Sequence, residues 1–231
     1  MKESWGLSKF GMFVSPVYYW VFPTWISILK RELDGLDLVL DLGCGNNSPL
    51  QYCKVKYKVG IDLFEPYLDE AKTKKIHNQY ITGDITKYRS LVHWEVQGPD
   101  AIIASQVLEH IEKVSSYRVM REMEEDASKK VIIAVPNGWR PQDEIDDNPN
   151  NPHVSAWYVE DFTKRGYKVY GTHGLKWLRG YRGWLLGPKW IPPWMKETFS
   201  DLTQRIVYYY PKWAFQLLAV KTTSNDVSTQ T

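Results

Sequence analysis

The chain has 231 residues, a formal net charge of +2 and a hydrophobic fraction of 43%. This length fits one α/β domain with additions and suffices to bury a full core. The near-neutral charge argues against a nucleic-acid partner. The two cysteines, Cys44 and Cys53, form neither a metal pattern nor a disulfide framework, which favours a reducing, cytoplasmic location.

The N-terminal region, residues 1–35, is rich in aromatic side chains. No charged residue lies between Lys9 and Lys30. The run is long enough for a membrane span, but Pro16, Pro23 and its aromatic rather than aliphatic character argue against one. We expect a cap packed over the core or over a ligand pocket, with contact at a membrane interface as the alternative.

From residue 36 onward, strand and helix patterns alternate as in a parallel α/β sheet. The predicted strands are 38–42, 56–61, 79–82, 101–105, 130–135, 167–170 and 213–220. The predicted helices are 66–75, one that contains Val119, Met120 and Met123, 159–164 and 198–209. Residues 36–222 are thus expected to form one domain, with an insertion at 174–197 and a flexible tail at 223–231.

The first predicted strand leads into an acidic, glycine-rich turn. Asp41 is followed by Gly43 and Gly45, then by Ser48, which can cap a helix, and Pro49, which suits a first helical position. Such a turn lets a ligand lie against bare backbone. A dinucleotide site would need a third glycine where Ser48 stands, so an NAD-dependent oxidoreductase is disfavoured.

Two more acidic residues follow predicted strands at the same edge of the sheet. Asp62 lies about twenty residues beyond the glycine turn, the spacing at which a carboxylate meets ribose hydroxyls. Asp84 follows the third strand. One such carboxylate commonly does no more than cap a helix or close a turn. Three of them beside a glycine turn indicate a nucleotide-like cofactor at the carboxyl ends of the strands.

The order acid-x-Gly-x-Gly resembles motif I of the class I S-adenosylmethionine (AdoMet) dependent methyltransferases. Residues 105–110, Ser-Gln-Val-Leu-Glu-His, resemble the V-L-E-H element of small-molecule members of that family. The resemblance implies a Rossmann-like seven-stranded α/β sheet, parallel with an antiparallel last strand, and methyl transfer from AdoMet to a small acceptor. The cofactor contacts that it implies are Asp41, Gly43, Gly45, Asp62, Leu63, Asp84, Ile85, Ser105 and Gln106.

Two histidines and one glutamate are candidates for the acceptor chemistry. A hydroxyl acceptor must lose a proton, which calls for a base such as histidine. His110 follows the fourth strand, and His153 lies in a His-x-Ser-x-Trp run that resembles a substrate-facing segment of related methyltransferases. Glu109 is the candidate that orients the base. Alternatively, both histidines serve helix starts. His77 and His93 are predicted to be surface residues.

No metal is predicted. In the ubiquinone-pathway O-methyltransferases the element is E-x-x-E-H and is associated with a divalent metal. Here Gln106 stands at the first position, so one carboxylate of that element is missing. The acidic residues within 143–147 are interpreted as a solvated face, because no His or Cys is spaced to complete a metal site.

The insertion at 174–197 mixes tryptophans with lysine and arginine, and no acidic residue occurs from Gly174 to Lys196. We expect a cap packed on the N-terminal region; the alternatives are a membrane surface and stacking on single-stranded nucleic acid. The prediction is a cytoplasmic methyltransferase of a small, apolar or aromatic acceptor, with peripheral membrane contact through the aromatic segments left open. A non-catalytic docking module with the same fold is the alternative. The sequence leaves the oligomeric state unknown.

Overall fold

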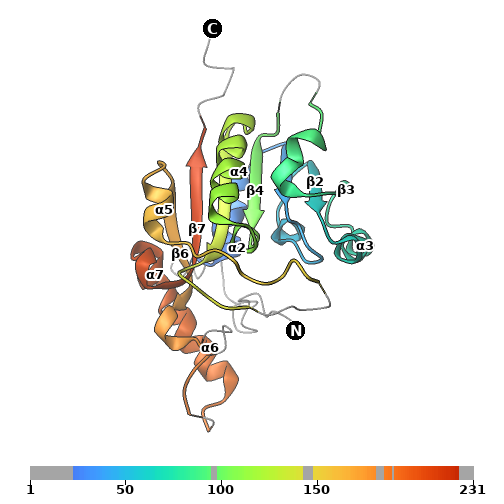
Figure 1. Cartoon of the computed structure of the whole chain (residues 1–231). Coiled ribbons are helices and arrows are strands. Elements are labelled where there is room, and N and C mark those ends of the chain that lie inside the picture. The colour runs from blue at the N-terminus through green and yellow to red at the C-terminus, as the bar shows by residue number, and fades with distance from the viewer. Residues whose placement is uncertain (1–22, 95–97, 143–147, 181–184, 189, 224–231) are drawn as a thin grey trace.

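The computed structural model describes residues 23–94, 98–142, 148–180, 185–188 and 190–223. Its centre is a seven-stranded sheet in the order β3-β2-β1-β4-β5-β7-β6 (Figure 1). The strands are β1 (Leu38–Leu42), β2 (Tyr57–Asp62), β3 (Gln79–Thr82), β4 (Ala101–Ser105), β5 (Lys130–Pro136), β6 (Lys168–Leu175) and β7 (Ala214–Thr222). β1 to β5 pair in parallel, and β7 runs antiparallel to both of its neighbours. The predicted fold class is confirmed.

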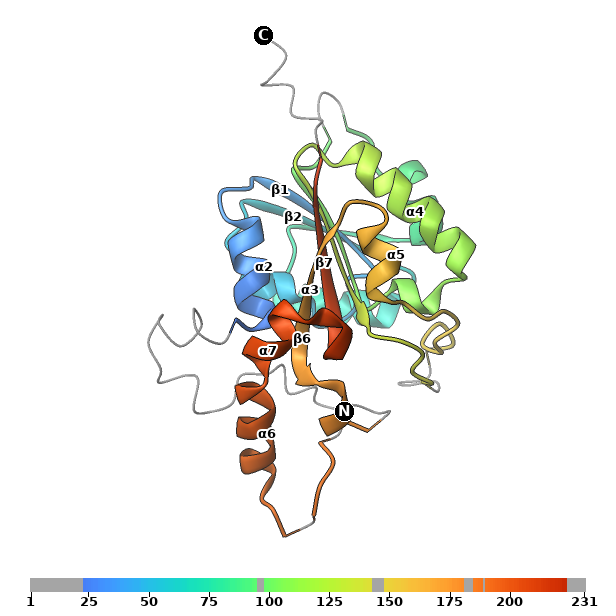
Figure 2. The ribbon, with the colours of Figure 1, turned by 90° about the vertical axis from the view of Figure 1, so that its left-hand side faces the viewer.

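Helices cover both faces of this sheet (Figure 2). The helices of the structure are α2 (Trp25–Leu33), α3 (Glu65–Lys74), α4 (Lys113–Asp126), α5 (Val159–Thr163), α6 (Pro193–Leu202) and α7 (Gln204–Tyr209). Of these, α6 points away from the sheet (Figure 2). Successive strand residues point to opposite faces. Ile102 of β4 therefore packs in one core cluster with residues of α4 and α5, while Ile103 packs in the other with residues of α2.

The described part of the N-terminal region belongs to the sheet's own core. Ile28, Leu29 and Leu33 of α2 are buried against one face. Residues 1–22, which carry most of the predicted cap, and the tail beyond residue 223 lie outside the described residues. None of the described helices is long and apolar enough to cross a membrane.

Two helix predictions need correction. The turn after β1 leads only into a short 3-10 helix, Pro49–Tyr52, capped by Ser48, whose side chain accepts from the Leu50 N–H at 3.1 Å. The helix predicted at 198–209 is two helices, α6 and α7, that meet at Thr203. The Thr203 hydroxyl donates to the Ser200 carbonyl at 2.6 Å and accepts from the Leu175 N–H at 3.0 Å. Because Thr203 makes this contact with β6, the helix is interrupted there and α6 and α7 are separate.

Candidate active site at the carboxyl ends of the strands

The glycine turn after β1 is wedged between the ends of β2 and β4. Gly43 and Gly45 have φ angles of 68° and 56°, which glycine adopts without strain. The Gly45 N–H donates to the carboxylate of Asp62 at 2.8 Å. A Cβ atom at Gly43 would lie 2.2 Å from a methyl carbon of Val107. The turn is thus positioned by tight backbone packing and leaves no room for a side chain at Gly43.

Asp41 holds this turn from inside the fold. Its carboxylate is buried, accepts from the Ser48 hydroxyl at 2.5 Å and lies 2.9 Å from Nε2 of His77. Because these bonds face the interior, the structure assigns Asp41 an anchoring role, and its direct contact with a cofactor stays a prediction. The expectation that His77 lies at the surface is wrong.

One feature of the sequence could have predicted that His77 is buried, namely a glycine within a strand. Gly60 lies in the middle of β2, where glycine often marks a close approach. A Cβ atom there would lie 3.0 Å from Nδ1 of His77 and 2.9 Å from the Cys44 sulfur. Gly60 therefore leaves the space that the imidazole fills.

The acidic residues after β2 and β3 bind backbone N–H groups at the same edge. The carboxylate of Asp62 accepts from Gly45 and from Phe64, the latter at 2.9 Å, and burial raises its pKa. Asp84 caps the next 3-10 helix through the Thr86 N–H at 2.8 Å. Each carboxylate oxygen keeps a second lone pair for a ligand hydroxyl or amine. Beside them, Leu63 is exposed and Ile85 is buried in the core.

The segment after β4 contains a strained residue. Gln106 has a φ angle of 57°, which is unusual for a residue with a long side chain and is often found at functional sites. Its side-chain oxygen accepts from Gln216 of β7 at 3.3 Å. The buried Ser105 hydroxyl and Gln106 amide nitrogen have no hydrogen-bond partner among the described residues. Buried polar atoms of this kind need a partner, which a bound ligand or an ordered water would supply.

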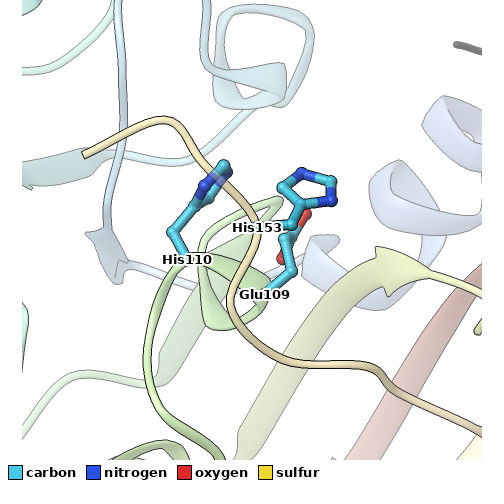
Figure 3. A group of neighbouring side chains, drawn as sticks. All are labelled: Glu109, His110 and His153. Carbon is cyan, nitrogen blue, oxygen red and sulfur yellow. The ribbon is translucent and has the colours of Figure 1, made fainter. Parts of the chain in front are cut away.

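The structure brings together the three predicted catalytic residues. Glu109 and His110 lie on one short 3-10 helix, Leu108–His110, and His153 lies on a loop beside it (Figure 3). One potential ligand atom from each residue lies within 4.8 Å of the others. The rings of His110 and His153 meet edge to face, with centroids 4.7 Å apart.

The His-x-Ser-x-Trp run holds this loop in place. The N–H groups of Val154 and Ser155 donate to the backbone oxygen of Glu109 at 2.8 and 3.1 Å. The Ser155 hydroxyl donates to the Leu108 carbonyl at 3.0 Å and accepts from the buried Trp157 indole at 3.1 Å. These bonds place the loop that carries His153 against the end of β4.

The imidazoles of His110 and His153 favour the neutral form. Burial lowers the pKa of His110 to about 4 and also lowers the pKa of His153. Nδ1 of His110 lies 3.2 Å from the Pro152 carbonyl, and Nδ1 of His153 lies 2.6 Å from the Arg140 carbonyl. Since a carbonyl only accepts, each Nδ1 carries the proton, and Nε2 is left with a lone pair.

Two imidazoles and one carboxylate form a donor set that accepts a proton or binds a divalent cation. The prediction that no metal binds rested on Gln106 and on spacing in the sequence. It did not anticipate that His153 would complete a cluster with Glu109 and His110. The absence of a metal therefore stays a prediction, while the geometry provides a place for one.

Comparison with known proteins shows a likeness to methyltransferases. Residues 40–125 match the family model described as a methyltransferase domain. This match covers β1 to α4, the part of the chain that contains the glycine turn and Glu109–His110. This region is therefore similar to a methyltransferase domain, and AdoMet is the methyl donor of the class I methyltransferases that it resembles. No curated protein matches the chain significantly.

Solved structures support the same fold. An AdoMet-dependent methyltransferase from Archaeoglobus fulgidus aligns with a TM-score of 0.52 and 15% identity, covering 90% of this chain and 98% of that one. A second, from Clostridium acetobutylicum, aligns with a TM-score of 0.51 and 12% identity, covering 92% and 93%. The methyltransferase domain of bacterial CtHen1-C aligns with a TM-score of 0.51 and 14% identity, covering 86% and 96%.

Proposed function

We propose that this chain transfers the methyl group of AdoMet to a small acceptor bound beside Glu109, His110 and His153. The observation that carries the proposal is the convergence of these three side chains, from two separate segments, next to the glycine turn and the end of β4. An acceptor lying there would contact the only cluster of this kind among the described residues.

The cofactor side of the proposal rests on the fit of the strand ends to an adenosine-like ligand. Gly43 and Gly45 would present bare backbone, and Asp62 would accept from ribose hydroxyls, as carboxylates do in related sheets. The unpartnered Ser105 hydroxyl and Gln106 amide would bond the amino-acid portion. Leu63, Asp84 and Ile85 would flank the base. When bound, AdoMet supplies an electrophilic methyl group on a sulfonium.

The acceptor side rests on neutral imidazoles beside a buried carboxylate. An acceptor hydroxyl becomes a better nucleophile when it donates its proton to a base. The lone pair on Nε2 of His110 or His153 is suited to receive that proton, and Glu109 is placed to stabilise the imidazolium that results. We assign His153 as the proton acceptor, because its Nδ1 lies 2.6 Å from the Arg140 carbonyl and this bond leaves Nε2 with a lone pair, and we assign His110 as a positioning residue.

The cofactor claim is tested by calorimetric titration of the full chain with AdoMet and with S-adenosylhomocysteine. We expect saturable binding of both compounds, because the backbone turn and the strand-end carboxylates are preformed. If the folded protein binds neither compound, the proposal is refuted. Binding of a nicotinamide dinucleotide instead would indicate an oxidoreductase.

The catalytic claim is tested by Glu109→Gln and His153→Asn. We expect turnover with a panel of phenols and long-chain alcohols to fall about 10²–10⁴-fold while the affinity for AdoMet changes little. The matched control is His93→Asn, an exposed histidine outside the cluster. Repeating the wild-type assay with a chelator separates the two uses of the cluster: activity that survives supports proton transfer, and activity restored only by a divalent metal contradicts it.

A further inference from the structure

We call residues 176–213 the projection; the structure describes 176–180, 185–188 and 190–213 of it, and the buried residues Gln204 and Val207 tie its last helix, α7, to the body of the molecule. Figure 2 shows α6 and the loop before it pointing away from the body of the molecule. Ten of the sixteen large hydrophobic side chains that are exposed among the described residues lie on it. They are Trp177, Leu186, Trp190, Met195, Phe199, Leu202, Ile206, Tyr209, Tyr210 and Trp213. Soluble proteins rarely gather so many on one segment unless the surface binds something.

These exposed side chains lie next to one another and form continuous apolar surfaces. Met195, Phe199 and Leu202 are four and three positions apart on α6 and therefore share one helix face. Tyr210 stacks on Trp213 at 5.1 Å between ring centroids, and Trp177 lies 6.0 Å from Trp213. Trp190, in the loop before α6, is 80% exposed. An apolar helix face normally points to the core, whereas this one points to solvent.

The charge of the projection indicates which kind of partner its exposed apolar surface binds. Residues 174–213 carry seven Lys or Arg and only two Asp or Glu, although the whole chain has a net charge of +2. A second copy of this chain would bring the same positive charge to the contact. An anionic lipid surface complements it, at about 1 kcal/mol per basic residue near the surface. Tryptophan and tyrosine rings also favour the lipid–water interface.

The position of the projection in the fold is also consistent with binding to an anionic lipid surface. In Figure 1 the arrow of β4 points toward the end of the molecule where α6 lies, so the projection stands at the edge that carries the candidate site. α2 begins at this end as well (Figure 2), and its first residues, from Trp25 to Leu29, carry no charge.

We propose that the projection docks the protein on an anionic membrane surface, with Trp190 and the Met195–Phe199–Leu202 face of α6 in contact with lipid. The basic side chains lie at the level of the headgroups, as in interfacial amphipathic helices. The candidate active site then lies on the membrane side of the molecule. This inference stands on the exposed surface and its charge, and it does not require the proposed function.

The test is co-sedimentation of the full chain with vesicles of phosphatidylcholine alone and of phosphatidylcholine mixed with phosphatidylglycerol. We expect binding to the mixed vesicles that weakens with added salt, and much weaker binding to the neutral ones. The double variant Trp190→Ser/Phe199→Ser should bind at least about tenfold more weakly, because it removes two large apolar contacts. Its thermal unfolding should match that of the wild type, since both side chains are exposed.

The matched control is Tyr57→Ser, which removes a 45% exposed apolar side chain from the start of β2, at the edge of the sheet opposite the candidate site. It should bind vesicles like the wild type. Failure of the wild type to bind mixed vesicles, or equal binding by the double variant, would overturn the proposal. A wild-type dimer that the double variant converts to a monomer, with no vesicle binding by either, would assign the surface to a second copy. AdoMet titration of the same samples reports separately on the proposed function.

Discussion

The edge formed by β1, β2 and the glycine turn differs from the projection in how its side chains are partnered. At the edge, Asp41, Ser48 and His77 bond one another within the fold, and Asp62 bonds the turn. On the projection, large apolar side chains such as Trp190 point to solvent. Changes at the edge should therefore alter folding together with cofactor binding, whereas changes on the projection should alter contacts with other molecules and leave stability nearly unchanged.

Gly43→Ala should have the largest effect on stability. The substitution places a Cβ atom 2.2 Å from Val107 and forces alanine to a φ angle of 68°. We expect a loss of about 2–5 kcal/mol from strain and overpacking, measured by urea unfolding. Gly45→Ala is the matched control, because its φ angle is also positive but no atom lies within 4 Å. It should cost about 1–2 kcal/mol, and equal losses in both variants would contradict the close packing of the turn.

Asp41→Ala should come next. Removing the carboxylate leaves the buried His77 imidazole and the Ser48 hydroxyl without this partner. We expect a loss of about 1–3 kcal/mol, together with weaker AdoMet binding because the turn loses its anchor. Asp69→Ala removes an exposed carboxylate paired with Lys72 and should cost about 0–1 kcal/mol. If Asp41→Ala unfolds no more easily than Asp69→Ala, the anchoring role is wrong.

The pH dependence of stability should show a smaller effect at the base of the projection. Burial lowers the pKa of His173 to about 3, against about 6.5 in an unfolded chain. Above pH 6.5 neither state is protonated. As the pH falls below 6.5, only the unfolded chain takes up this proton, so stability decreases, by up to about 2 kcal/mol at pH 5.

His173→Asn provides the comparison, because asparagine tolerates the φ angle of 65° found at this position. Its melting temperature should fall less between pH 7 and pH 5 than that of the wild type. Identical pH profiles for the two proteins would show that the imidazole of His173 titrates normally in the folded state.

Much of the fold could be predicted because its signals are local. The strands β1, β3 and β4 begin and end at the predicted residues, since each apolar run stops at a glycine or a polar residue. The helix predicted at 198–209 was divided by Thr203, whose hydroxyl contacts Leu175 in β6. That bond joins segments distant in sequence, and no local pattern signals it.

The sequence by itself determined the class of ligand, because the turn at Asp41–Gly45 and the carboxylates of Asp62 and Asp84 stand at spacings that neighbouring strands convert into one edge. Only the tertiary structure decided that His77 is buried against Asp41, and that His153 joins Glu109 and His110. The reason is physical. Turns and strand ends follow from short-range backbone geometry, whereas these side-chain clusters depend on loops that fold back from far along the chain and are held by hydrogen bonds and packing.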